Sequence, residues 1–157
     1  MSNAELALAI PALYFFVVAF PLVWIDLKER RLPNRLTLPG LALSALGLVS
    51  AAFLGEPLKA LASFGVALAL FIVGVFLSFR GWLGMGDVKL LSGVSLVVGA
   101  FDLSLVPILL GSVLVCVVVY AALFYTRQLK SNRFALGPAI CLSYLLCLAL
   151  IVIRLLG

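Results

Sequence analysis

Two aspartates, Asp26 and Asp87, each lie where a long apolar stretch of the chain meets polar sequence. Asp26 follows the apolar run 14–25, and Asp87 follows Gly-Met-Gly (84–86) at the start of another run. Ionisable side chains at membrane depth are costly and usually serve a function. Two carboxylates that are brought together can share a proton and activate water. The pair therefore predicts a dyad that hydrolyses peptide bonds inside a membrane.

Peptide hydrolysis by two carboxylates requires them to be in different protonation states. The ionised one takes a proton from the attacking water, and the neutral one donates a proton to the carbonyl oxygen of the scissile bond. Two neighbouring carboxyl groups cannot both ionise easily, so the pair itself creates the difference and no metal is required. Because Asp87 precedes a predicted helix, whose positive end favours an anion, we expect Asp87 to be the base and Asp26 the acid. Gly84 and Gly86 lack a Cβ and would let an extended substrate backbone approach Asp87.

Each aspartate also has a purely structural interpretation. Asp87 could be the N-cap of the next helix, which is a common use of aspartate. Asp26 could be a solvated residue at the end of a span, paired with Lys28 or Arg30. The joint occurrence of two acids at span boundaries on one predicted face favours the catalytic interpretation.

The composition is that of a membrane protein. Of the 157 residues, 66% are hydrophobic and the mean hydropathy is +1.33, whereas soluble domains are about 45–50% apolar. The chain contains no histidine, which excludes Ser-His and Cys-His catalysis and HExxH zinc sites. The three cysteines, Cys116, Cys141 and Cys147, form no CxxC pair and are expected to be small buried residues. No metal and no cofactor are predicted.

Six apolar stretches are interpreted as membrane-crossing helices, which need about 20 residues each. They cover residues 5–25, 36–54, 58–79, 87–101, 104–125 and 135–156. The sequence therefore predicts an all-α, polytopic membrane protein with six transmembrane helices in a single domain, residues 1–157. The fourth stretch is short, with fourteen residues from Val88 to Phe101, so either the bilayer thins locally or the helix begins below the membrane surface, near Asp87. Asn34 is expected to cap the second helix.

The distribution of charge predicts the orientation in the membrane. The predicted loops 26–35, 80–89 and 127–133 hold nine of the eleven basic residues, whereas the opposite face holds only Lys59 and Arg154. By the positive-inside rule these loops are cytoplasmic, both termini are extracytoplasmic, and both aspartates lie on the cytoplasmic side. The net charge of +5 then reflects contact with anionic head groups of the lipid bilayer, and no nucleic-acid partner is expected.

Three segments resemble motifs of one known family, the type IV prepilin peptidases. Residues 26–34 hold an aspartate followed by an aliphatic-Pro-Asn turn, which is similar to the first aspartate motif of that family. Residues 84–90, Gly-Met-Gly-Asp-Val-Lys-Leu, resemble its second motif, Gly-x-Gly-Asp-x-Lys-Leu. Residues 136–139, Leu-Gly-Pro-Ala, resemble a Phe-Gly-Pro motif at the start of the last span, with Leu136 in place of the aromatic residue.

The resemblance implies an aspartic endopeptidase that removes the short basic leader from prepilins or pseudopilins at the cytoplasmic face of the bacterial inner membrane. It makes Asp26 and Asp87 the catalytic pair. Seven further residues match the motifs and are expected to shape the substrate site or its loops: Pro33, Asn34, Gly84, Gly86, Lys89, Gly137 and Pro138. For Lys89 two interpretations stay open, a role in tuning Asp87 or holding the loop, and an ordinary lysine that reaches the membrane interface.

Larger members of that family also methylate the new amino terminus, using a cytoplasmic insert that often carries CxxC motifs. The chain has no such insert and is similar to the short members that process Flp-type pilins of tight-adherence systems, so no S-adenosylmethionine site is expected. Lipoprotein signal peptidases and presenilin-like proteases have other motifs that are missing here. A small carrier or channel with a carboxylate ion site, and a non-catalytic assembly protein, are the alternatives from other classes. The sequence specifies neither the cognate pilin nor an oligomeric state.

Overall fold

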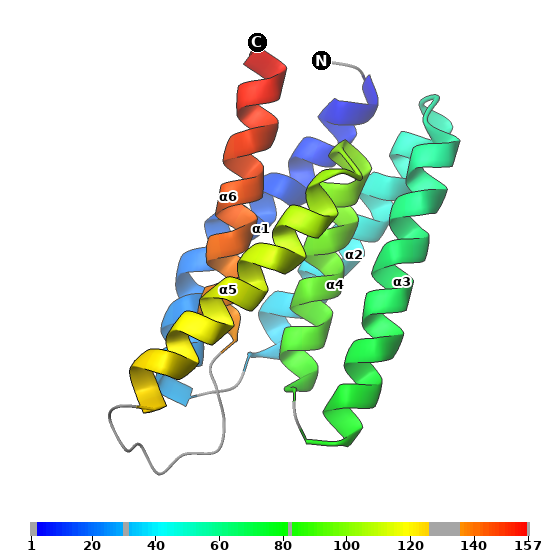
Figure 1. Cartoon of the computed structure of the whole chain (residues 1–157). Coiled ribbons are helices and arrows are strands. Elements are labelled where there is room, and N and C mark those ends of the chain that lie inside the picture. The colour runs from blue at the N-terminus through cyan, green and yellow to red at the C-terminus, as the bar shows by residue number, and fades with distance from the viewer. Residues whose placement is uncertain (1–2, 30–31, 82, 126–135, 157) are drawn as a thin grey trace.

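The computed structural model describes residues 3–29, 32–81, 83–125 and 136–156, and these form a bundle of six α-helices. The helices are α1 (Asn3–Glu29), α2 (Asn34–Phe53), α3 (Pro57–Phe79), α4 (Met85–Phe101), α5 (Leu105–Tyr125) and α6 (Gly137–Leu156). Successive helices run in opposite directions, so the first and last helices have their free ends at the same end of the bundle (Figure 1). The predicted all-α fold with six helices is confirmed.

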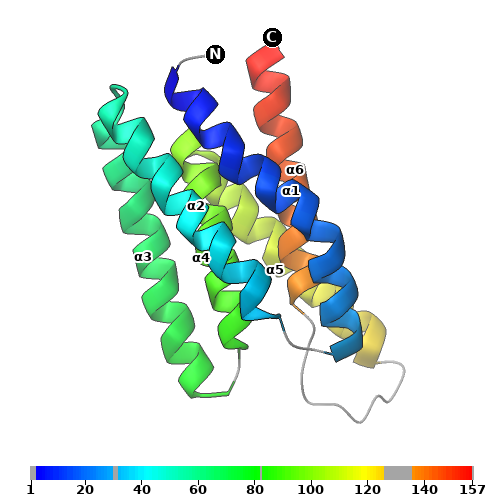
Figure 2. The same ribbon diagram turned by 180° about the vertical axis from the view of Figure 1, so that it is seen from behind.

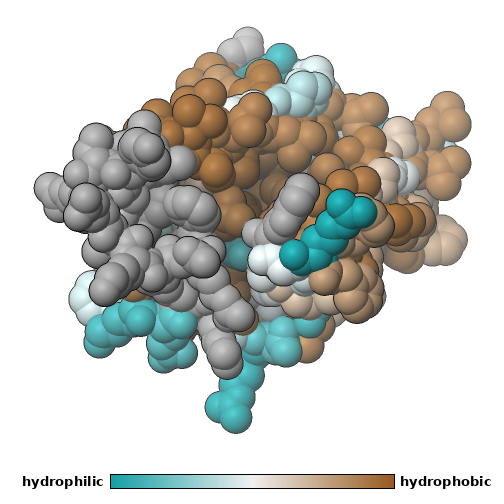
Figure 3. Space-filling view, turned by 60° about the horizontal axis from the view of Figure 1, so that its bottom comes forward, coloured by the Kyte–Doolittle hydropathy of each residue, from teal (hydrophilic) through white to brown (hydrophobic). Residues whose placement is uncertain are grey.

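The outside of the bundle is apolar. By length and composition, α1, α2, α3 and α6 are able to cross a membrane. Large hydrophobic side chains such as Phe53 and Phe79 project from the bundle. Figure 3 shows hydrophobic residues over the sides and hydrophilic ones gathered towards one end. A large contiguous apolar surface of this kind is stable against lipid rather than water, and the prediction of a polytopic membrane protein is confirmed.

α4 is the central helix. It contacts each of the other five helices, and α1 and α2 lie on one side of it while α5 lies on the other (Figures 1 and 2). Glycines allow this close packing. A Cβ on Gly93 would come within 2.9 Å of the Phe15 ring, and one on Gly74 would come within 2.6 Å of Val88. The first turn of α4 is thereby held inside the bundle.

α4 begins two residues earlier than predicted. It starts at Met85, with Gly84 as its N-cap residue, and has 17 residues, or about 25 Å of helix. Asp87 is the third residue of the helix and Gly84 is the N-cap residue, so the interpretation of Asp87 as the N-cap is wrong.

The predicted cap of α2 is also wrong. The helix begins at Asn34 itself, Pro33 is the N-cap residue, and no side chain caps the helix. The Pro33 carbonyl accepts the first hydrogen bonds of the helix, from the N–H groups of Leu36 at 3.0 Å and Thr37 at 3.3 Å. The Asn34 side chain is therefore free to make a contact with another helix, described below.

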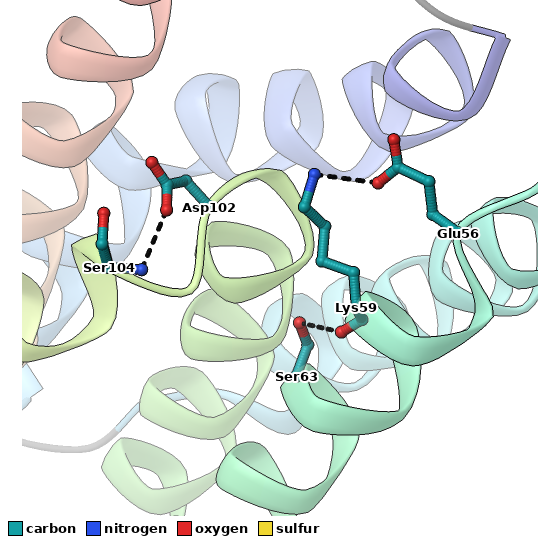
Figure 4. A network of polar contacts seen from close by, with 5 residues as sticks. All are labelled: Glu56, Lys59, Ser63, Asp102 and Ser104. Carbon is teal, nitrogen blue, oxygen red and sulfur yellow. Dashed lines mark hydrogen bonds and ion pairs between the residues drawn. The ribbon is translucent and has the colours of Figure 1, made fainter.

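The end of the bundle that holds both chain termini carries charges that pair locally. Lys59 Nζ lies 2.9 Å from Glu56 Oε2, and Arg154 forms an ion pair with Asp102. Asp102 also accepts a hydrogen bond of 2.9 Å from the Ser104 N–H at the turn between α4 and α5 (Figure 4). These acids have local structural roles and lie at the opposite end from Asp26 and Asp87.

Candidate active site

Asp26 and Asp87 are both buried at the end of the bundle opposite the termini. Asp26 lies in the last turn of α1 and is 3% exposed, and Asp87 lies in the first turn of α4 and is 8% exposed. The interpretation of Asp26 as a solvated residue paired with Lys28 is wrong, because Asp26 is buried and the Lys28 ammonium lies 5.4 Å from the centre of the Trp24 ring. The other suggested partner, Arg30, lies outside the described residues. Both carboxylates therefore depend on groups inside the protein.

The two carboxylates interact electrostatically. α1 and α4 pack against each other, and the charge of Asp26 acts on Asp87. In a buried site, where the effective dielectric constant is low, two negative charges repel each other far more strongly than in water. A pair of this kind is most stable when it holds one proton between its two members. The tertiary structure thus brings together the two acids that the sequence singles out.

Asp26 is held by the first residue of α6. The Gly137 N–H donates a hydrogen bond of 2.8 Å to Asp26 Oδ2. A Cβ on residue 137 would lie 2.7 Å from that oxygen, so only glycine allows this approach without displacing the carboxylate. Pro138 follows as the second residue of the helix, where a proline is tolerated because its missing N–H would have no partner within the helix. Gly137, predicted only to shape the site, is in direct contact with one of the two acids.

Asp87 has different surroundings. Its Oδ1 is fully buried and has no hydrogen-bond partner among the described residues. Its Oδ2 faces Gly84, where a Cβ would lie 2.8 Å away. A buried polar atom without a partner is unfavourable and is often found where a ligand or a reaction uses it. The two aspartates therefore differ, since Oδ1 of Asp87 is buried without a partner among the described residues and no oxygen of Asp26 is found in that state.

Two contacts join Leu32 of the loop before α2 and Asn34, the first residue of α2, to the start of α4. A Cβ on Gly86 would lie 2.7 Å from Leu32 Cβ and 3.0 Å from the Leu32 carbonyl oxygen, so Leu32 packs directly on the backbone of Gly86. Lys89 Nζ donates a hydrogen bond of 3.0 Å to Asn34 Oδ1. Within the described residues Lys89 forms no ion pair with Asp87, and its contact favours the role of holding the loop. The residues of the two aspartate motifs are thus assembled into one site.

Sequence reasoning missed two members of this site. Cys141 lies one turn after Gly137, is buried, and is close enough to Asp26 for the two side chains to interact electrostatically. Its burial was predicted, but its position beside Asp26 could have been found only from its four-residue spacing to Gly137 on a helix. Leu32 is the aliphatic residue of the first aspartate motif, but nothing in its type indicates that it packs on Gly86. Of the other cysteines, Cys147 is buried as predicted, whereas Cys116 is only partly buried.

The described residues contain no group of three or more Cys, Asp or Glu side chains that could hold a metal ion. A family model described as the type IV leader peptidase family matches residues 13–123. The match covers well over half of the chain, includes both aspartates with Gly84 and Gly86, and ends before Gly137. No curated protein and no solved structure matches the chain.

Proposed function

The chain belongs to the type IV leader peptidase family, and we propose that it is an aspartic endopeptidase that removes the short basic leader from prepilins or pseudopilins. The observation that carries the proposal is the arrangement of Asp26 and Asp87, which are buried, come from different helices and interact electrostatically. Each carboxylate lies directly against a glycine of a motif, Gly137 or Gly84. Burial of two neighbouring acids is energetically costly, and a protein that only assembles others would gain nothing from it.

The hydrogen bonds favour Asp26 as the base and Asp87 as the acid, which reverses the assignment expected from sequence. Asp26 accepts the Gly137 N–H at the positive end of α6, and both features favour a carboxylate that carries the charge. Asp87 also lies near a helix start and interacts with the backbone of Gly84, but its Oδ1 is buried and has no partner among the described residues. An unpartnered oxygen is the natural position for the proton that is donated to the substrate.

The reaction then follows the usual course for a carboxylate pair. Asp26 takes a proton from water as the water oxygen bonds to the scissile carbonyl carbon, and Asp87 donates its proton to the carbonyl oxygen. The tetrahedral intermediate collapses when the C–N bond breaks. Asp26 gives its proton to the leaving nitrogen, and the hydroxyl group of the intermediate returns a proton to Asp87. Both residues are restored, and no metal or cofactor enters any step.

Gly84 supports access of a substrate to the dyad. It is exposed, whereas Asp87 beside it is buried, and a Cβ at this position would meet Asp87 Oδ2. The absence of a side chain leaves a route by which an extended peptide backbone reaches the carboxylate. An extended backbone is required because a peptide bond inside a helix is shielded from attack.

The proposed site faces the cytoplasm, at the inner membrane of a bacterium. Lys28, Arg35 and Arg80 are exposed at the end of the bundle that carries the dyad, and basic residues near membrane spans favour the cytoplasmic side. Cleavage is proposed to occur without methylation, because α1 ends at Glu29 and α2 begins at Asn34, which leaves no room for a methyltransferase insert. The lack of this insert is shared with the short family members that process Flp-type pilins, which supports small Flp-type prepilins as the substrates.

The test is cleavage of a co-expressed Flp-type prepilin, with the product identified by its mass. We expect the wild type to remove the leader without adding a methyl group, and Asp26→Asn and Asp87→Asn to leave the prepilin intact. Asp102→Asn is the matched control, because it changes an acid at the other end of the bundle that pairs with Arg154. An Asp26→Asn or Asp87→Asn variant that cuts at the rate of the control would contradict the proposal.

A further inference from the structure

An apolar groove runs along the outside of the bundle between α1 and α6. Its volume is about 640 Å³, within the range of about 300–1,000 Å³ that is typical of binding pockets. α1 and α6 contact each other along this side of the bundle (Figures 1 and 2). The groove is lined by Phe16, Val17, Ala19, Phe20 and Val23 of α1 and by Pro138, Cys141, Leu142 and Leu145 of α6.

One end of this groove lies beside the candidate active site. Val23 lies one helical turn before Asp26, and Pro138 directly follows Gly137, whose N–H binds Asp26. From there the groove extends to Phe16 and Leu145, seven residues away on each helix, or about 10 Å. A second groove, between α5 and α6, includes no residue next to either aspartate. Of these two grooves, the one between α1 and α6 is therefore the one that lies next to the dyad.

We propose that this groove binds the apolar membrane helix of the substrate, next to the bond that is cut. The proposal rests on the peptidase function proposed above. Apart from the thiol of Cys141, every side chain that lines the groove is purely hydrocarbon, so its occupant must present an apolar surface. Inside a bilayer the occupant must also satisfy its own backbone hydrogen bonds, which an α-helix does and an extended strand does not.

With the groove in this position, the bound substrate has two parts, one at the carboxylates and one in the groove. The scissile bond must be extended where it meets the carboxylates, whereas the part in the groove must be helical. The change from extended chain to helix then occurs at the level of Val23 and Pro138. The enzyme then cuts the peptide bond that lies just outside the membrane helix of the substrate. Because the helix lies in the groove, the position of the groove determines how far the cleavage site is from the apolar segment.

Photo-crosslinking tests whether the helix lies in the groove. The wild type must first cut the Flp-type prepilin, which tests the peptidase function by itself. In the inactive Asp87→Asn background, residue 20 is then replaced by p-benzoylphenylalanine and the same prepilin is supplied. The matched control places the same group at Phe79, because Phe20 and Phe79 are similarly exposed, at 77% and 84%, and α3 contacts neither α1 nor α6.

We expect a covalent adduct with the apolar segment of the prepilin from position 20 and none from position 79. Equal adducts from both positions, or adducts from position 20 with phospholipid alone, would show that lipid fills the groove and would overturn the proposal. If the wild type does not cut the prepilin, the peptidase function fails and the groove proposal falls with it.

A second variant pair measures the effect of the groove on cleavage. Val17→Trp fills part of the groove, whereas Val73→Trp adds the same ring to the surface of α3, and both valines are largely exposed, at 63% and 55%. We expect Val17→Trp to raise KM for the prepilin about tenfold with little change in kcat, the effect of losing about 1.4 kcal/mol of binding, and Val73→Trp to change neither. Equal KM values for the two variants would overturn the proposal.

Discussion

The backbone N–H of Gly137 and the carboxylate of Asp26 are joined by a hydrogen bond of 2.8 Å across 111 positions of sequence. The bond ties the last turn of α1 to the first residue of α6. It gives Asp26 a fixed orientation and a neighbouring helix end that favours its charged form. Oδ1 of Asp87 is buried and has no partner among the described residues, which distinguishes it from Asp26.

Gly137→Ala is expected to reduce cleavage strongly while leaving the bundle folded. The added methyl group would lie 2.7 Å from Asp26 Oδ2, so the carboxylate must move, and a displacement of about 1 Å in an active site can cost on the order of a hundredfold in rate. The measurement is the cleavage rate together with the unfolding temperature in detergent. Gly65→Ala is the control, because no atom lies within 4 Å of the added group, and equal rates in the two variants would contradict the role of Gly137.

Infrared spectroscopy can identify which aspartate carries the proton. We expect the purified wild type at neutral pH to show the C=O stretching band of a protonated carboxylic acid. The band should disappear in Asp87→Asn and persist in Asp26→Asn, because Asp87 has a buried oxygen without a partner among the described residues, whereas Asp26 accepts the Gly137 N–H. The opposite pattern would restore Asp87 as the base, and this result does not depend on having the right substrate.

The contact between Lys89 and Asn34 should affect cleavage through the loop rather than through Asp87. A single exposed hydrogen bond contributes about 0.5–1.5 kcal/mol, so we expect Lys89→Ala and Asn34→Ala each to lower kcat/KM several-fold. The double variant should be no worse than either single one, because both remove the same bond of 3.0 Å. If Lys89 acted directly on Asp87, Lys89→Ala would be much more damaging than Asn34→Ala.

Gly74→Ala is expected to destabilise the bundle by about 1–3 kcal/mol, as overpacking of a close helix contact usually does. The new Cβ would lie 2.6 Å from one methyl group of Val88 and 3.0 Å from the other. Removing both methyl groups with Val88→Ala in the same chain should recover most of the lost stability. Thermal unfolding in detergent measures both effects, and a double variant no more stable than Gly74→Ala would show that the contact is not the cause.

The sequence by itself determined the class of fold and the identity of the two acids. Runs of apolar residues as long as the membrane core form helices because the backbone has no other way to satisfy its hydrogen bonds in lipid. The six predicted stretches are therefore found as α1 to α6, with shifts of a few residues at their ends. Asp26 and Asp87 were recognisable because charged side chains at such positions are rare and their motifs are local in sequence.

Only the tertiary structure decided how these residues are arranged. α4 begins at Met85, so Asp87 is not its N-cap residue. The side chain of Asn34 contacts Lys89 and does not cap α2. The burial of Asp26 and its bond to Gly137 depend on α1 and α6 meeting at one end of the bundle. Side-chain type and local spacing predict how a segment folds, but they do not predict which distant backbone N–H lies beside a carboxylate. The surroundings of each carboxylate are determined by the packing of helices that are far apart in sequence. This packing gives the two chemically identical aspartates different hydrogen-bond partners.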